Sequence, residues 1–298
     1  MTRMFTLKKL SFLLTVCLVL HVSLFGQVTN NVEPQKENGF YRKSNFNVEE
    51  LKVRWKKAAL ENCPGVPCTI VPPPPSFSCG TSTVLDGNGN SYNTVTIGTQ
   101  CWTKQNLKAT LYNDGITVIP DETSNTGWGT LNTGARAEYV ASGVTSYVSN
   151  YGYLYNWYAA AGIITAGGTS TKNICPIGWR VPSDTDWTNL TTLLGTNAGG
   201  KLKSTATGTS TTAWLSPNTN ATDQYGFSAL PGGTLFNFGA ALLFYGVNYN
   251  ALFWSASEQN TNIARYRVLY FNSGSIPTND IIINGSKTNG FSIRCLKD

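Results

Sequence analysis

The stretch NICPIGWRVPSDTDWTNL, residues 173–190, decides the fold of this chain. It predicts a helix that begins after Ser183, because serine is a preferred N-cap residue and Asp186, three positions on, can complete a capping box. Asp184 then lies in the first turn, where the helix dipole favours a negative charge. The apolar positions that follow recur at helical spacing: Trp187, Leu190 and Leu194.

Two other interpretations of Asp184 and Asp186 are open from the sequence. As a general acid and base, the pair would need surroundings that push the two pKa values apart, and neighbouring positions in one helical turn do not provide them. As calcium ligands the two side chains have suitable chemistry, because calcium prefers several oxygen ligands, but their spacing matches no calcium loop. We therefore expect a helix start and no catalytic residue here.

Residues 1–26 have the pattern of a secretory signal peptide. Arg3, Lys8 and Lys9 precede an apolar run over residues 10–25. A run of about 16 residues is shorter than the roughly 18–20 that span a bilayer, although a retained N-terminal anchor stays open. No later segment of the sequence is apolar enough to span. We expect an exported protein, either secreted or held at the outer surface or in the periplasm.

The charge of the chain argues against a nucleic-acid partner. The sequence has 22 Lys and Arg against 16 Asp and Glu, a net charge of +6. Removal of residues 1–26 takes away three positive charges and no negative ones, which leaves 19 against 16, or +3. Much of that excess lies in one short run at residues 51–57. The remainder is close to neutral, whereas nucleic-acid-binding domains carry clustered basic surfaces.

Histidine is confined to the signal peptide, because the one histidine of the chain is His21. The processed protein would therefore contain none. This excludes Ser-His-Asp and Cys-His catalysis and any metal site with a histidine ligand. We expect that the protein is not an enzyme.

Six cysteines remain after processing, and an even number in an exported chain predicts disulfides. Six cysteines allow fifteen connectivities. Their neighbourhoods in the sequence favour one set: a tight loop around PGVP, a link across a hairpin, and a link from the middle of the chain to its end. The pairs are Cys63–Cys68, Cys79–Cys101 and Cys175–Cys295.

Residues 27–76 differ from the rest and are predicted to form a stalk. Residues 47–62 fit a short helix, residues 63–68 a small disulfide loop, and residues 69–75, TIVPPPP, a stiff polyproline spacer. The alternative is a basic docking helix for an envelope partner. Residues 77–298 then make one α+β domain, since about 220 residues leave no room for a second core.

Short strands dominate the predicted domain. Residues 82–98 alternate around an Asp-Gly-Asn-Gly turn and predict a hairpin; a calcium loop is the alternative, but its glutamate is missing, since Ile97 stands at the twelfth position. Residues 151–163 fit a short helix that carries Leu154, Trp157 and Tyr158. Further strand candidates are residues 227–233, 252–257, 264–271, 281–285 and 291–297.

Several motifs, in this order, resemble the Fibrobacter succinogenes major paralogous domain, a family of secreted or surface proteins of Bacteroidetes and Fibrobacteres. They run from about Cys79 to Asp298: DGNGNSYNTVTIGTQCWTKQNL, YGYLYNWYAA, ICPIGWRVPSDTDWTNL, GGKLK, GFSALPGG, FWSASE and SIRCLKD. The resemblance implies a C-type lectin-like domain, with a twisted antiparallel sheet, two short helices and long irregular loops. It implies no established activity. One departure is Thr103, where the family often has methionine.

Formylglycine-generating enzymes share the C-type lectin-like architecture and use a reactive cysteine pair with copper. In this chain all six cysteines have disulfide partners in the favoured set, which leaves no spare thiol. We therefore expect no cofactor. The oxygen-bearing side chains could bind calcium, but no calcium-binding motif occurs in the sequence.

Binding is the function that remains, and residues 229–254 are the candidate segment, where lectin-like domains carry their long variable loop. Aromatic rings could stack on sugar faces while amides bind hydroxyls, so we expect a carbohydrate or an envelope protein as partner. The alternative is that these rings fill the core. Calcium-dependent sugar binding is doubtful, because the nearest match to Glu-Pro-Asn is SPN at residues 216–218. The candidate binding residues are Phe236, Asn237, Phe238, Tyr245, Asn248, Tyr249 and Trp254.

Overall fold

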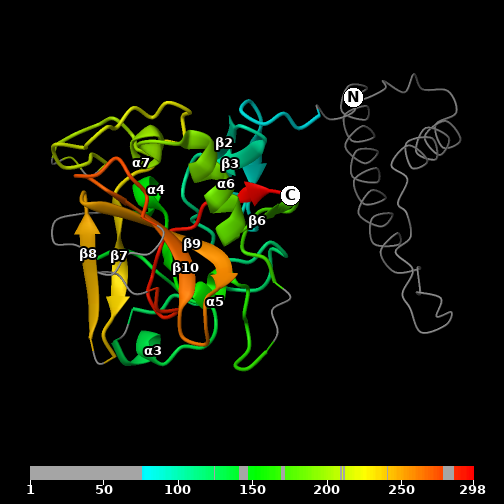
Figure 1. Cartoon of the computed structure of the whole chain (residues 1–298). Coiled ribbons are helices and arrows are strands. Elements are labelled where there is room, and N and C mark those ends of the chain that lie inside the picture. The colour runs from blue at the N-terminus through cyan, green and yellow to red at the C-terminus, as the bar shows by residue number, and fades with distance from the viewer. Residues whose placement is uncertain are drawn as a thin grey trace, which may run out of the picture. The chain divides into compact units, whose positions relative to one another are not determined.

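The computed structural model describes the chain from residue 76 to residue 298, with short gaps. The gaps are residues 124, 141–146, 169–171, 209, 211, 240 and 278–284. All described residues lie in one compact unit, Pro75–Asp298, drawn in colour in Figure 1. The predicted signal peptide, the stalk and the Cys63–Cys68 pair lie outside the described residues.

The first sheet has five antiparallel strands in the order β1-β2-β3-β11-β6. It joins the start of the described chain to its end, because β11 lies between β3 and β6 (Figure 1). β1 and β2 form the hairpin that residues 82–98 predict. The strands are β1 (Thr83–Leu85), β2 (Ser91–Ile97), β3 (Gln100–Thr103), β6 (Trp179–Arg180) and β11 (Leu296–Lys297).

The second sheet has four strands in the order β10-β9-β7-β8. β7 and β9 are parallel, and the one residue pair between them is Gly233 with Ala251. Further along, the two strands separate, and the segment that contains Gly290 and Ser292 lies between them, with Gly290 paired to Leu235 of β7 and Ser292 paired to Phe253 of β9. The strands are β7 (Gly232–Asn237), β8 (Leu242–Val247), β9 (Asn250–Glu258) and β10 (Ala264–Tyr270), and the short strands β4 (Arg136–Ala137) and β5 (Leu154–Tyr155) form a separate pair.

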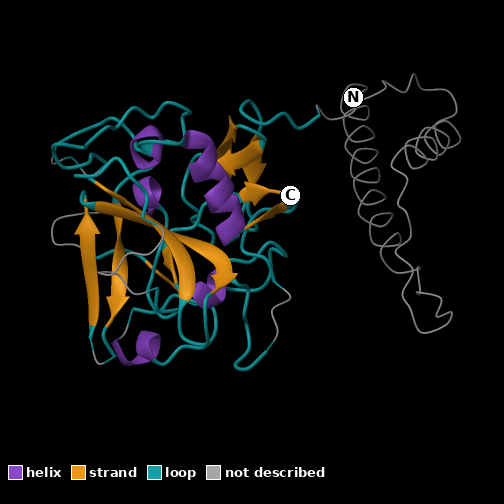
Figure 2. Ribbon diagram, viewed as in Figure 1, coloured by secondary structure: helices purple, strands orange, loops and turns teal. Residues whose placement is uncertain are grey.

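Five short helices lie among the described residues, whereas the resemblance predicts two (Figure 2). Only one of them, α6, exceeds five residues. None of the described helices is long and apolar enough to cross a membrane. The fold is thus mixed α+β, with mostly antiparallel sheets. The helices are α3 (Asn125–Gly129), α4 (Tyr147–Tyr151), α5 (Trp157–Ala160), α6 (Asp184–Leu194) and α7 (Ala198–Leu202).

Helix α6 begins as the sequence predicts. The Ser183 Oγ accepts from the backbone N of Asp186 at 3.2 Å, and the Asp186 Oδ2 accepts from the backbone N of Ser183 at 2.7 Å, which completes the capping box. The buried face of the helix carries the three predicted residues, Trp187, Leu190 and Leu194. Local sequence therefore places the one longer helix correctly.

The prediction of a helix over residues 151–163 is wrong in its first half. Leu154 lies in strand β5, and helix α5 begins after Asn156, whose Oδ1 accepts from the backbone N of Ala159 at 2.9 Å. The cause is a tertiary contact, since Tyr155 and Phe291 exchange two backbone hydrogen bonds of 2.9 Å. The predicted terminal strand is also shorter than residues 291–297, because regular pairing is limited to β11.

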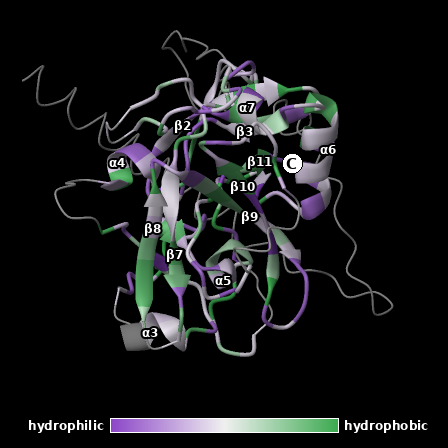
Figure 3. Cartoon of the chain, turned by 60° about the vertical axis from the view of Figure 1, so that its left-hand side comes forward, coloured by the Kyte–Doolittle hydropathy of each residue, from purple (hydrophilic) through white to green (hydrophobic). Residues whose placement is uncertain are grey.

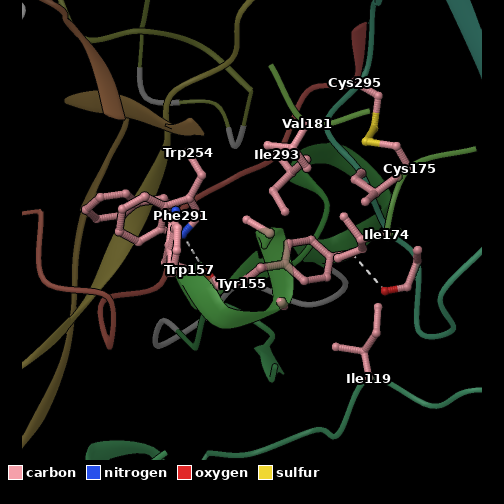
Figure 4. Close-up of a cluster of buried hydrophobic side chains, with 14 of the residues drawn as sticks. Ile119, Tyr155, Trp157, Ile174, Cys175, Val181, Trp254, Phe291, Ile293 and Cys295 are labelled. Atoms are coloured by element: carbon pink, nitrogen blue, oxygen red, sulfur yellow. Dashed lines mark hydrogen bonds between the residues drawn. A yellow bond between two sulfur atoms is a disulfide. The ribbon is translucent and has the colours of Figure 1, made fainter. Parts of the chain in front are cut away.

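Two disulfides hold the domain. Cys79 is bonded to Cys101 across a separation of 22 residues, and Cys175 to Cys295 across 120. Both are pairs that the sequence neighbourhoods favour. Figure 4 shows the second bond at the edge of a large hydrophobic cluster that also contains Trp254.

Candidate functional site

The aromatic residues of segment 229–254 are divided between the core and the surface. The antiparallel register of β7 and β8 places Phe236 opposite Leu243 and Thr234 opposite Tyr245, so these four side chains share one face of the hairpin. The other face carries Leu235 and the alternate residues of β8. The register thus decides which rings are accessible.

The accessible face forms a cluster that we name the hairpin patch: Phe236, Phe238, Leu243 and Tyr245. Phe238 is 66% exposed, Tyr245 53% and Leu243 48%, while Phe236 is half-buried. The ring of Phe236 lies 5.9 Å from that of Phe238 and 6.4 Å from that of Tyr245, measured between centroids. Figure 3 shows hydrophobic colour along much of β8 and on part of β7. Adjacent exposed apolar side chains of this kind mark interaction sites.

The opposite face of the hairpin is packed into a separate hydrophobic cluster. Leu235 is fully buried there, and Leu242 and Phe244 pack against the cluster. The ring of Phe244 lies 5.2 Å from that of Tyr139. Antiparallel sheets usually place polar residues on the face that is not packed on the core. On the face that carries the patch, Phe236 packs partly against the main hydrophobic cluster, whereas Phe238, Leu243 and Tyr245 stay exposed, so the core accounts for Phe236 but not for the other three.

Trp254 was predicted as a binding residue, and this is wrong. Its side chain is fully buried, its ring lies 4.1 Å from that of Phe291, and its Nε1 donates to the carbonyl oxygen of Tyr155 at 2.7 Å (Figure 4). The reason is that Trp254 points to the side of β9 that the segment around Phe291 covers.

The two candidate asparagines have internal roles. The Asn237 Oδ1 accepts from the backbone N of Gly239 at 2.9 Å, and its Nδ2 donates to the Thr288 Oγ1 at 2.9 Å. Asn248 has a left-handed backbone, with φ of 67°, and its Nδ2 donates to the carbonyl oxygens of Ser210 and Ala213. Asn248 therefore uses both amide hydrogens inside the protein, and Asn237 uses one of its two.

Tyr249 is exposed but does not belong to the patch. It lies in the turn between β8 and β9, at the other end of β8 from Phe238, and its ring meets that of Phe271 edge-on at 5.4 Å. Leu243 joins the patch although aromatic composition did not select it. The signal that could have found it is its position two residues before Tyr245 on the same strand.

The patch lies in an uncharged part of the chain. No charged residue occurs from residue 224 to residue 257. The carboxylates at the two borders are engaged: the Asp223 Oδ2 accepts from the Ser228 Oγ at 2.6 Å, and Glu258 pairs with Lys287. The patch therefore offers ring faces and one exposed phenol, on Tyr245, rather than ionic groups.

The aspartates of the opening stretch are bound to arginines. Asp186 accepts from Arg180 at 2.5 and 3.0 Å, and Asp184 accepts from Arg267 at 2.6 Å. Burial raises the pKa of Asp186, but hydrogen bonds from Arg180 and Ser183 outweigh this effect and hold the pKa below its ordinary value of 3.8. These contacts explain both carboxylates as parts of the fold.

Of the other two segments weighed as calcium ligands, only the first has its carboxylate satisfied by protein donors. The Asp86 Oδ1 accepts from the backbone N of Asn88 and Asn90, and its Oδ2 accepts from the Tyr92 hydroxyl at 2.6 Å. In the SPN triplet, Asn218 is buried and its Nδ2 donates to the carbonyl oxygen of Ser204, while its buried Oδ1 has no hydrogen-bond partner in the described part of the chain. Among the described residues, no group of three or more acidic, histidine or cysteine side chains could hold a metal ion.

Comparison with protein families matches residues 95–297 to the Fibrobacter succinogenes major domain. The match covers more than half of the 298 residues and includes both α6 and the hairpin patch. No curated protein and no solved structure matches the chain. The chain belongs to the Fibrobacter succinogenes major domain family.

Proposed function

We propose that this domain is an exported, surface-type binding module with a C-type lectin-like fold, and that it binds carbohydrate through the hairpin patch. The proposed fold rests on the sequence resemblance. One longer capped helix, antiparallel sheets and long irregular segments are consistent with it. The two disulfides suit an oxidising compartment outside the cytoplasm.

The single observation that carries the function is the exposure of adjacent rings on one face of β7 and β8. The side chains of Phe238 and Tyr245 leave more than half of their surface in water, a cost that a partner covering the rings would remove. Aromatic faces stack well on the apolar faces of sugars while the Tyr245 hydroxyl stays free to bond a sugar hydroxyl. Phe236, Phe238 and Tyr245 supply the faces.

The position of the patch fits this role. In Figure 1 the first described residues and the C-terminal end lie by the first sheet, while β8 lies on the other side of the domain. The patch is therefore remote from the point where the chain enters the domain.

We also propose that the domain is not an enzyme and needs no bound metal or cofactor. The four described cysteines are all in disulfides, which leaves no thiol among them for copper chemistry of the formylglycine-generating type. The paired aspartates are bound to arginines. A free-thiol assay on the native full chain tests this, because a reactive thiol would contradict it.

The experiment for carbohydrate binding is a glycan array with the exported protein, with and without calcium. The double variant Phe238→Ser/Tyr245→Ser should lose the bound glycans. Leu193→Ser is the matched control, since Leu193 is also exposed, at 54%, but lies on α6. If the double variant bound the same glycans as strongly as the wild type, the proposal would be wrong.

A second candidate function is adhesion through an envelope protein. Leu243 favours it, because an aliphatic side chain in the middle of the patch suits a protein surface better than a sugar ring. The test is co-purification of the protein with envelope proteins. Co-purification that persists when glycans are absent, and that Leu243→Ser weakens, would support this candidate over carbohydrate binding.

A further inference from the structure

We infer that the hairpin patch takes an uncharged polysaccharide as a single chain in solution, and that it does so by ring stacking without calcium. This inference rests on the proposed carbohydrate function and narrows the ligand to one chemical class. It depends on three observations: the charge around the patch, the state of its polar groups, and the angles between its rings.

The first observation is the lack of charge. The hairpin belongs to a run of 34 residues, 224–257, without a charged side chain. Helix α3, whose Gly129 lies beside the hairpin turn, is also uncharged. Lys287 belongs to the chain that passes β7, but it is buried and paired with Glu258. An acidic or basic polysaccharide would lose part of its hydration on this surface and gain no ion pair.

The second observation concerns hydrogen bonds. Calcium-dependent sugar sites need several oxygen ligands from the protein, and β7, β8 and the turn between them contain no carboxylate. The Asn237 side chain is held by the protein, because its Nδ2 donates to Thr288 and its Oδ1 accepts from the backbone N of Gly239. Stacking of the aromatic rings on sugar rings therefore supplies most of the contact with the ligand. Such stacking selects a sugar by the apolar face that it presents, and not by the arrangement of its hydroxyl groups.

The third observation is the tilt of the rings. The plane of the Phe236 ring makes an angle of 43° with that of Phe238 and 38° with that of Tyr245. Three rings that share no plane cannot all lie flat on the surface of a crystalline polysaccharide. They can contact successive sugars of one twisted chain. The geometry thus favours a soluble chain over a crystalline surface.

The test is affinity electrophoresis of the full exported protein in gels that contain a soluble neutral β-glucan or, as a charged comparison, polygalacturonate. A sedimentation assay with microcrystalline cellulose adds the flat surface. We expect retardation in the neutral gel alone, unchanged by EDTA and by raised salt. Phe238→Ser and Tyr245→Ser should each weaken it roughly threefold to tenfold, a range set by the worth of one aromatic contact. Leu193→Ser should leave it unchanged.

The outcomes separate this inference from the function on which it rests. Retardation by polygalacturonate, loss of binding with EDTA, or stronger binding to the crystalline surface would overturn the inference and leave carbohydrate binding intact. Binding to none of the three polysaccharides, together with an empty glycan array, would overturn both. The substituted side chains are exposed, so thermal unfolding of the variants should match the wild type; equal stability with equal retardation would place the ligand away from the patch.

Discussion

The Nη1 of Arg267 on β10 donates to the Oδ1 of Asp184, the first residue of α6, at 2.6 Å. The arginine side chain is only 1% exposed, and its Nη2 also reaches the carbonyl oxygen of Asp184 at 3.3 Å and the Thr188 Oγ1 at 3.2 Å. Asp184 thus has two roles: its charge suits the helix N-terminus, and it neutralises a buried cation from a strand 83 residues away.

Asp184→Ala should therefore destabilise the domain, because it leaves the Arg267 guanidinium buried without its carboxylate. Breaking a buried ion pair costs about 3–5 kcal/mol. Asp184 keeps 38% of its side-chain exposure, so water offsets part of this, and we expect about 1–3 kcal/mol. Urea unfolding measures the difference. Thr185→Ala, at the exposed next position, should change stability far less; equal losses would mean that the pair contributes nothing.

The lowered pKa of Asp186 leads us to predict how the free energy of unfolding depends on pH. The folded-state pKa of this residue lies below 3.8 because the hydrogen bonds of Arg180 and Ser183 outweigh the effect of burial. Just below that value the unfolded chain binds more protons at this position than the folded chain does. The stabilisation is therefore fully present above about pH 4 and is lost as the pH falls through the lower folded-state pKa.

The test compares the wild type with Asp186→Asn by chemical unfolding across acidic pH. At neutral pH we expect the variant to be less stable by about 1.5–3 kcal/mol, the worth of hydrogen bonds to a charged group. The gap should narrow as both proteins are taken below pH 4. A gap that stays constant with pH would show that the charge of Asp186 is not what stabilises the helix start.

The two disulfides should differ in their effect on stability. In the chain-entropy model a cross-link stabilises more when it closes a longer loop, and separations of 120 and 22 residues differ by about 1.5 kcal/mol. Cys175→Ser/Cys295→Ser should therefore destabilise more than Cys79→Ser/Cys101→Ser. Thermal unfolding of the two double variants measures this. A larger loss from the shorter link would point to a contribution from packing at Cys101 instead.

Local signals in the sequence explain which parts of the fold could be predicted. The start of α6 depends on Ser183 and Asp186, three residues apart, and the first hairpin depends on one turn; both are placed correctly. The prediction over residues 151–163 failed because pairing with Phe291, more than 130 positions away, overrides helical spacing. Arg267 was not expected as the partner of Asp184 for the same reason, since nothing near either residue indicates the other.

The candidate site shows the same limit. Composition selected the aromatic segment but could not assign faces, because the face of a strand residue depends on the register with its neighbours. Phe238 and Tyr245 are exposed, whereas Trp254 lies in the core. The asparagines were chosen for their amides, which the fold uses for its own turns and loops. A one-residue change of register between β7 and β8 would have moved Tyr245 to the packed face, whereas Trp254 belongs to a part of β9 that is buried on both faces.

This division between faces gives the last prediction, which sets Trp254 against Tyr245. Trp254→Ala removes a fully buried ring and the hydrogen bond to the Tyr155 carbonyl, so it should cost about 3–5 kcal/mol. Tyr245→Ala removes a ring that is 53% exposed and should cost less than about 1 kcal/mol while it weakens ligand binding. Measurements on both variants should therefore show a large loss of stability for Trp254→Ala, and weaker ligand binding with nearly unchanged stability for Tyr245→Ala. If Tyr245→Ala destabilised the domain as much as Trp254→Ala does, the Tyr245 ring would be part of the core. The hairpin patch would then lack the only ring that carries a hydroxyl group.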